Sequence, residues 1–125
     1  MADIKQEILK ARAMVSRGEL KPAIAHLLQV GAIEEAVRTL VKNHRYDEAA
    51  VILLDAVGTP VKDYGSLDTL KTRYVTLAAS LYARTTKHKE AAKLLVAIGQ
   101  KNKAIEVLEK AGENAAADKL RGKDD

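Results

Sequence analysis

The amino-acid sequence predicts an all-α protein, a short α-solenoid in which about eight helices form stacked antiparallel hairpins. Three observations predict this fold. Ala, Leu, Lys and Glu, which are strong helix formers, dominate the composition. A pair of one small and one large apolar residue recurs every 13 residues, and helix-breaking residues lie between successive pairs.

The composition indicates one folded domain over residues 1–125, with 47% hydrophobic and 30% charged residues. The sequence contains no cysteine, so disulfides, thiolate metal sites and cysteine nucleophiles are excluded. We see no signal peptide and no apolar run of membrane-spanning length, and we expect a cytoplasmic protein without membrane contact. The net charge of +4 permits an acidic partner without requiring one.

The repeated unit is an alanine followed four residues later by a leucine. The pairs are Ala23–Leu27, Ala36–Leu40, Ala49–Leu53, Ala91–Leu95 and Ala104–Leu108. This spacing places both side chains on one helical face, where the alanine allows a neighbouring helix to approach and the leucine fills the adjacent space. Breakers or polar residues precede the units at Gly18, Gly31, His44, Thr86, Gly99 and Gly112. Each unit is therefore predicted to be a short helix followed by a tight turn.

A longer period of 68 residues relates two halves of the chain, about 3–57 and 67–121, separated by a loop at 58–66. It matches Ala23 with Ala91 and Gly31 with Gly99. We predict helices at 3–17, 19–30, 32–43, 45–57, 67–85, 88–98, 101–111 and 113–121. Ser66 is the predicted N-cap of the fifth helix, with Asp68 in its first turn.

These helices resemble tetratricopeptide repeats (TPR), a family of 34-residue helix–turn–helix units. The best match spans about Thr72 to Ile105, and two such units account for the 68-residue period. The residues at the motif positions are Val75, Ala78, Ala79, Tyr82, Ala91 and Leu95. Trp and Phe are absent, and the short helices also look like those of clathrin- and coatomer-type solenoids. The resemblance implies a right-handed stack that binds proteins in a concave groove and catalyses no reaction.

In a TPR-type array the first helix of each repeat lines the groove. Placing this sequence on that frame directs a largely basic set of side chains into the groove: Lys5, Ile8, Arg12, Arg38, Lys42, Arg73, Thr76 and Arg84. We therefore expect the groove to bind an acidic or C-terminal peptide through charge-assisted hydrogen bonds. The alternative is that these residues are ordinary solvated lysines and arginines. A homodimer through the apolar residues of the first helix (Ile4, Ile8, Leu9 and Val15) is a further expectation.

Other chemistry is weakly indicated. His26, His44 and His88 lack companion ligands at metal-binding spacing, so we expect no metal and no cofactor. The paired carboxylates lie in the first turns of helices, where the helix dipole favours negative charge, and no phosphate-binding loop is present. A nucleic-acid-associated protein is the main alternative, because Lys71, Arg73, Arg84, Lys87, Lys89 and Lys93 cluster in the sequence, although only four tyrosines could stack on bases. A non-catalytic regulatory subunit of an enzyme is a third possibility.

Overall fold

The computed structural model describes residues 3–122, which contain eight α-helices, one short 3-10 helix and no β-strand. The elements in chain order are α1 (Ile4–Ser16), α2 (Leu20–Gln29), α3 (Ile33–Lys42), α4 (Tyr46–Val57), η1 (Val61–Ser66), α5 (Thr69–Ala83), α6 (His88–Ala97), α7 (Lys101–Lys110) and α8 (Asn114–Arg121). Every predicted α-helix is confirmed, with ends within two residues of those expected.

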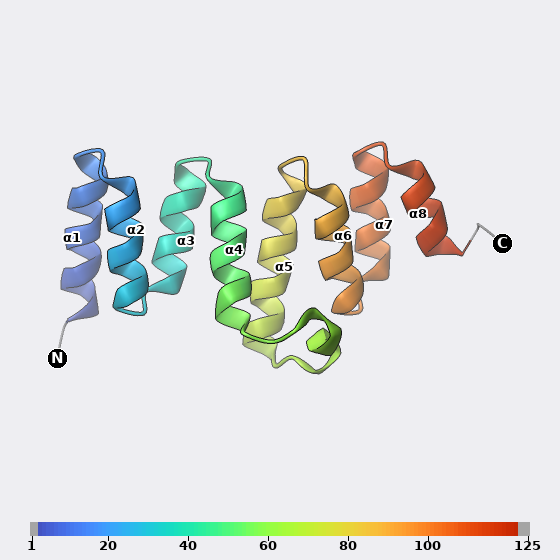
Figure 1. The fold of residues 1–125 in the computed structure, drawn as a ribbon, viewed down its shortest axis with the longest axis horizontal. Helices are drawn as coiled ribbons and strands as arrows, with labels where there is room; N and C mark the ends of the chain where they lie inside the picture. The colour runs from blue at the N-terminus through green and yellow to red at the C-terminus, as the bar shows by residue number, and fades with distance from the viewer. Residues whose placement is uncertain (1–2, 123–125) are drawn as a thin grey trace.

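The helices form an open row in which each helix packs mainly against the next one along the chain (Figure 1). The most extensive of these interfaces joins α4 to α5, across the long loop between the two halves. The helices α1 and α8 lie at opposite ends of the row. This sequential packing confirms the predicted helical-repeat arrangement, because a closed bundle would bring the first and last helices together.

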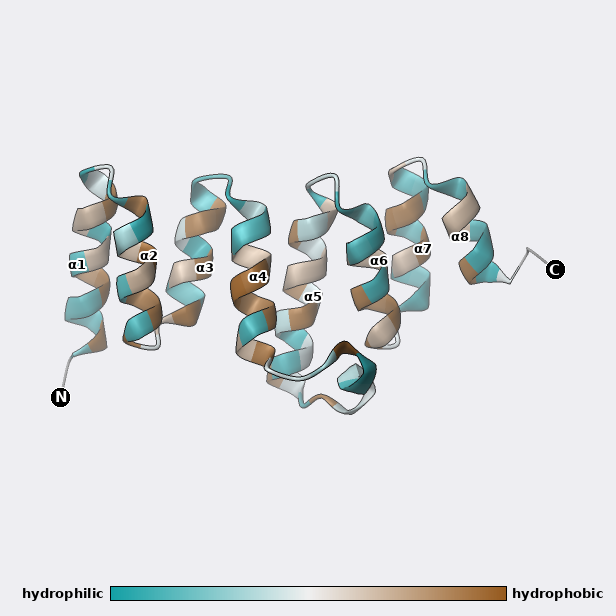
Figure 2. Cartoon of the chain, viewed as in Figure 1, coloured by the Kyte–Doolittle hydropathy of each residue, from teal (hydrophilic) through white to brown (hydrophobic). Residues whose placement is uncertain are grey.

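The repeated alanines form the centre of the core. Ala23, Ala36, Ala49, Ala91, Ala104 and Ala117 are all fully buried, and the leucines that follow five of them are buried too. A methyl group at each crossing allows two helices to approach closely, and the neighbouring leucine fills the remaining space. In Figure 2 the hydrophobic colour is strongest on α4, in the middle of the row, and weaker on α1 and α8. The recurring pair in the sequence therefore predicted the core correctly.

The tight turns occur at the predicted helix-breaking residues, and all of these except Thr86 adopt a left-handed backbone conformation. Gly99 adopts a φ of +82°, and His44 occupies the corresponding place in an earlier turn with a φ of +59°. The left-handed region costs glycine little, whereas a residue with a Cβ is strained there. Thr86, the other predicted non-glycine breaker, is not in this region. In that turn the Thr85 hydroxyl donates to the Tyr82 carbonyl oxygen at 2.7 Å and accepts from the Lys87 amide at 3.0 Å.

The loop between the halves is more ordered than predicted. It contains η1, which contacts α6 and buries the Tyr64 side chain. The predicted N-cap at Ser66 is wrong, because Ser66 ends η1 and Asp68 caps α5 instead. The Asp68 carboxylate accepts a hydrogen bond from the Lys71 amide at 2.8 Å. A carboxylate at this position also interacts favourably with the helix dipole.

Candidate functional site

Three adjoining hollows follow one side of the row, over α1, α3 and α5. Their volumes are about 310, 220 and 470 Å³. The first two hollows share Glu34, Arg38 and Tyr74, and the second and third share Arg73 and Leu77. Because adjacent hollows have walls in common, they form one continuous surface, which we call the trough. Its lining residues are Ile4, Ile8, 31–35, Val37, Arg38, Val41, Leu53, Leu67, Thr69, 72–74, Thr76 and Leu77.

Much of the trough is apolar and open to solvent. Ile4 on α1 and Leu77 on α5 are each 47% exposed, and Val37 and Val41 on α3 are half-buried between them. Single exposed apolar residues are ordinary on a protein surface, but here several lie along one connected depression. Such a surface can bury apolar side chains of another molecule.

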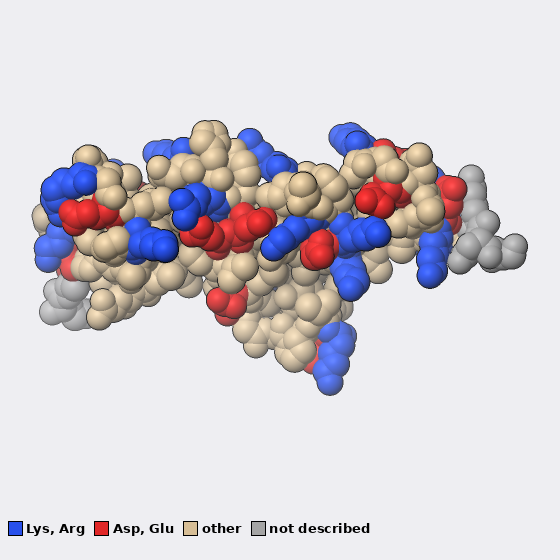
Figure 3. Space-filling model, turned by 45° about the horizontal axis from the view of Figure 1, so that its top comes forward, with Lys and Arg blue, Asp and Glu red and all other residues tan. Residues whose placement is uncertain are grey.

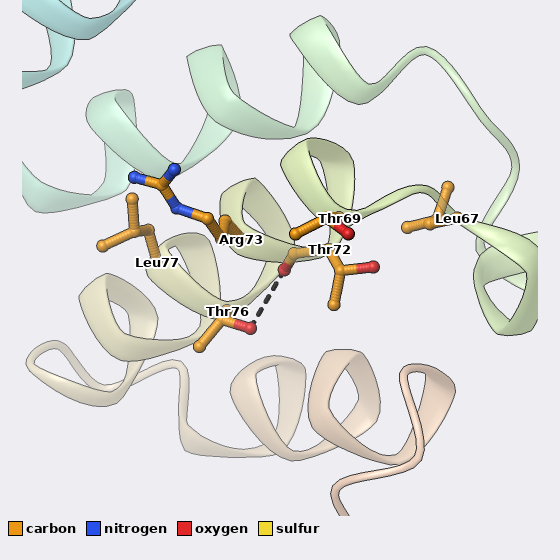
Figure 4. A pocket seen from close by; sticks show the side chains of 6 residues that line it. All are labelled: Leu67, Thr69, Thr72, Arg73, Thr76 and Leu77. Atoms are coloured by element: carbon orange, nitrogen blue, oxygen red, sulfur yellow. Dashed lines mark hydrogen bonds between the residues drawn. The ribbon is translucent and has the colours of Figure 1, made fainter.

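On α5 the trough is bordered by a charged residue and a row of threonines (Figure 4). Arg73 and Leu77 project from the same side of α5, one helical turn apart. The Thr76 hydroxyl donates to the Thr72 carbonyl oxygen at 2.9 Å, within the helix. The Thr76 hydroxyl proton is therefore engaged within the helix, but the hydroxyl oxygen can still accept a hydrogen bond from a ligand.

The trough is less basic than the sequence predicted, because two glutamates at the start of α3 also line it. The Glu35 carboxylate accepts hydrogen bonds from Arg12 on α1 at 2.8 Å and from Arg38 on α3 at 3.1 Å. The Tyr74 hydroxyl lies 3.5 Å from the Glu34 carboxylate. Partial burial, together with the negative charge of Glu34, raises the pKa of Tyr74 above its usual value.

The predicted site residues are only partly brought together. Arg38, Arg73 and Thr76 line the trough together with Ile8. Lys5 and Lys42 are exposed but do not line these hollows, and Arg12 is occupied by its pairing with Glu35. Arg84 lies elsewhere: it is the C-cap of α5, and its guanidinium carbon stands 4.5 Å from the centre of the Tyr46 ring on α4.

Sequence reasoning missed several lining residues, above all Glu34, Tyr74 and Leu77. A signal for two of them existed, because Leu77 lies one turn beyond the predicted Arg73 and Glu34 one turn before the predicted Arg38. The TPR frame selects single positions on each first helix, whereas a surface depression is lined by every side chain on the exposed face of that helix. The frame therefore selects fewer residues than line the trough on these helices.

The basic residues in the second half of the chain do not form a uniform positive patch. Lys87 lies 3.6 Å from the Asp47 carboxylate, and Lys89 lies 3.8 Å from the Glu113 carboxylate. On the face shown in Figure 3, basic and acidic side chains alternate along the edge that carries the tight turns. Mixed charge of this kind is typical of a solvated protein surface.

The histidines are involved in local contacts. His26 Nε2 lies 3.2 Å from the Glu7 carboxylate, and His44 Nδ1 lies 2.9 Å from the Tyr46 hydroxyl. Between residues 3 and 122, no group of three or more His, Asp or Glu side chains is arranged to hold a metal ion. None of the helices in the same range combines the length and the apolar character needed to cross a bilayer.

The trough thus offers apolar side chains, two guanidinium groups and partly buried polar groups on three successive hairpins. Guanidinium groups bind carboxylates through paired hydrogen bonds, and the adjacent apolar surface can bury aliphatic or aromatic groups.

Comparison of the chain with models of protein families, with curated proteins and with solved structures found no match.

Proposed function

We propose that this protein is a non-catalytic interaction module, an adaptor or scaffold, that binds a segment of a partner protein in the trough. The observation that carries this proposal is the continuity of the trough, in which three hollows on α1, α3 and α5 share their walls. An elongated surface of this kind matches an extended or helical peptide better than a compact small molecule. The resemblance of the region from Thr72 to Ile105 to TPR units supports the same function.

The lining chemistry suggests which peptides would bind. Arg73 stands where the second and third hollows meet and has no ion-pair partner within residues 3–122. Arg38 already shares the Glu35 carboxylate with Arg12. Arg73 is therefore the stronger candidate for binding a carboxylate of the ligand. Large apolar side chains of the ligand would pack on Ile4 in the first hollow and on Leu77, where the second and third hollows meet.

A nucleic-acid ligand is less well supported. Stacking on bases needs accessible aromatic rings, but Tyr64 and Tyr82 are buried, Tyr46 lies beneath Arg84, and only the half-buried Tyr74 lines the trough. Two lysines that could contact phosphates, Lys87 and Lys89, lie near carboxylates instead. We therefore favour a protein ligand, either for an adaptor or for a regulatory subunit that docks onto an enzyme.

The proposal is tested by selecting short random peptides on the wild-type protein and measuring their affinity for the double variant Arg38→Glu/Arg73→Glu. Peptides that bind the trough should carry Asp or Glu next to large apolar residues. Their affinity for the variant should fall by roughly tenfold or more, as expected when charge-assisted contacts are replaced by like-charge repulsion. Arg84 is not used for this test, because reversing its charge would disturb its packing on Tyr46.

A matched control is Lys21→Glu/Lys62→Glu, which changes the net charge equally at exposed residues outside the trough. Binding should be retained in this control. Equal affinity of every selected peptide for the wild-type protein and Arg38→Glu/Arg73→Glu would contradict the proposal. Tight, salt-dependent binding of random single-stranded oligonucleotides, with no peptide recovered, would favour the nucleic-acid alternative.

A further inference from the structure

A separate hollow of about 310 Å³ lies between α6 and α8, outside the trough. Its apolar lining is formed by Ala92 and Val96 from α6, Leu108 from α7, and Ala116 and Leu120 from α8. Leu108 and Ala92 are buried and belong to the core, whereas Val96 is 41% exposed. The hollow is therefore an open apolar groove between α6 and α8, and α7 contributes Leu108 to its lining.

Three lysines surround this groove: Lys89, Lys93 and Lys119. Lys89 lies 3.8 Å from the Glu113 carboxylate, but within residues 3–122 neither Lys93 nor Lys119 forms an ion pair. Among residues 3–122, no acidic residue lines the groove. The charge of its rim is thus positive, whereas the trough combines arginines with glutamates.

The internal repeat explains why the groove is open. With the offset of 68 residues, Ala92 corresponds to Ile24 on α2, and Ala116 corresponds to Glu48 on α4. In the first half Ile24 is partly buried and packs against both core clusters. In the second half a methyl group replaces the larger Ile24 side chain, so less of the space between α6 and α8 is filled. Glu48 fills no such space in the first half, because its side chain is 50% exposed and pairs with Arg45.

A segment of the chain itself also packs against α6. The η1 segment contacts α6, and its Tyr64 side chain is buried in the same core cluster as Leu94 and Leu95 of α6. An intramolecular segment with one large side chain thus already packs beside this helix. The groove toward α8 offers a similar place with no described segment of the chain in it.

We propose that the groove between α6 and α8 is a second docking site, which binds a short acidic segment of a partner protein. One or two large apolar side chains of that segment occupy the hollow over Leu108, which suits its volume of about 310 Å³, at the small end of the range for ligand pockets. Asp or Glu residues flanking them pair with Lys93 and Lys119. The groove and the trough involve different helices, so the two sites can be occupied at the same time.

The test uses the first half of the chain as a guide. The variant Ala92→Ile places in the groove the residue found at the matching position, Ile24, and should close the hollow, at some cost in stability because Ala92 is buried. Short random peptides are selected on the wild-type protein, and their binding is then measured by fluorescence anisotropy. Peptides specific for the groove should lose roughly tenfold or more in affinity for Ala92→Ile, as when a central apolar anchor is lost.

Two further variants make the result specific. Lys93→Glu/Lys119→Glu should weaken the same peptides, whereas Ala115→Ile, on an exposed residue of α8 outside the groove, should not. Circular dichroism establishes that each variant is folded. Arg38→Glu/Arg73→Glu should leave this binding intact, which separates failure of this site from failure of the trough.

Three outcomes would overturn the assignment. In the first, every selected peptide binds Ala92→Ile as well as the wild-type protein. In the second, the peptides that depend on the groove carry no excess of Asp and Glu. In the third, sedimentation shows a wild-type dimer that Ala92→Ile converts to a monomer, in which case the occupant is a second copy of this chain.

Discussion

Arg12 on α1 and Glu35 on α3 are joined by two hydrogen bonds to one carboxylate oxygen, from Nη2 at 2.8 Å and from Nε at 3.0 Å. The Glu35 side chain is only 10% exposed, and Arg38 donates to its second oxygen at 3.1 Å. One carboxylate therefore connects the first two hairpins and neutralises part of the charge at the N-terminal end of the trough.

Glu35→Ala should lower the free energy of unfolding by about 1 kcal/mol, because two charge-assisted contacts are lost at the surface. Glu34→Ala is the matched control. It removes the same charge from the same helical turn but only the 3.5 Å contact with Tyr74, so its cost should be smaller. Urea unfolding followed by circular dichroism measures both values. Equal costs would mean that the Arg12–Glu35 connection contributes nothing to stability.

Enlarging a core alanine should be strongly destabilising. Ala104 is fully buried where α7 packs against its neighbours, and Ala104→Leu should lower the free energy of unfolding by about 1–3 kcal/mol through overpacking. Ala25→Leu, on the exposed side of α2, should change it by less than about 0.5 kcal/mol. Thermal or urea unfolding of the two variants distinguishes them. A tolerated leucine at position 104 would show that close helix approach is not what the repeated alanines provide.

The tight turns provide a test of backbone strain. Gly99→Ala should cost about 1–2 kcal/mol, because alanine is disfavoured at a φ of +82°. No steric clash contributes, since a Cβ placed at Gly99 meets no atom within 4 Å. His44→Ala should cost less, because His44 already has a side chain at a φ of +59° and loses only its exposed contact with Tyr46. The difference in unfolding free energy between these variants measures the strain directly.

Stability should decrease at alkaline pH. Burial raises the pKa of Tyr64 above its usual value near 10.0, because the phenolate would lose its hydration. The neutral phenol therefore favours folding below the pKa of the unfolded chain, and this contribution is lost as pH rises through the higher pKa of the folded state. Urea unfolding of the wild-type protein should show this loss above about pH 10, and Tyr64→Phe should reduce it. An identical pH dependence in the two proteins would exclude Tyr64 as a source.

Local patterns in the sequence were sufficient to predict the helices and the core. The spacing of Ala23 and Leu27 specifies a buried face, and Gly99 ends a helix, wherever the neighbouring helices lie. Contacts between distant residues could not be predicted in this way. The placement of Arg84 over Tyr46 depends on the α4–α5 crossing. The choice of Asp68 over Ser66 as the cap depends on η1, which the Gly and Pro residues of the loop did not indicate.

The predicted groove residues and the lining of the trough agree only in part for the same reason. Helical periodicity places Arg38 and Arg73 on the first helices of their hairpins, and the frame directs them to one side. The frame does not show that the Glu35 carboxylate pairs with Arg12, because that pairing depends on the angle between α1 and α3. Sequence reasoning therefore predicted a basic groove, whereas the structure has a mixed apolar trough with Arg73 as its unpaired cation among residues 3–122.

The most direct test of peptide binding in the trough is an NMR titration of the isotope-labelled protein with the tightest selected peptide that still binds Ala92→Ile, so that binding in the groove is excluded. The backbone amide signals of residues lining the trough, such as Ile8, Arg38, Tyr74 and Leu77, should shift together with one dissociation constant, and signals on α2 and α8 should change little. Shifts confined to other helices, or lost equally in Lys21→Glu/Lys62→Glu and Arg38→Glu/Arg73→Glu, would contradict the proposed function.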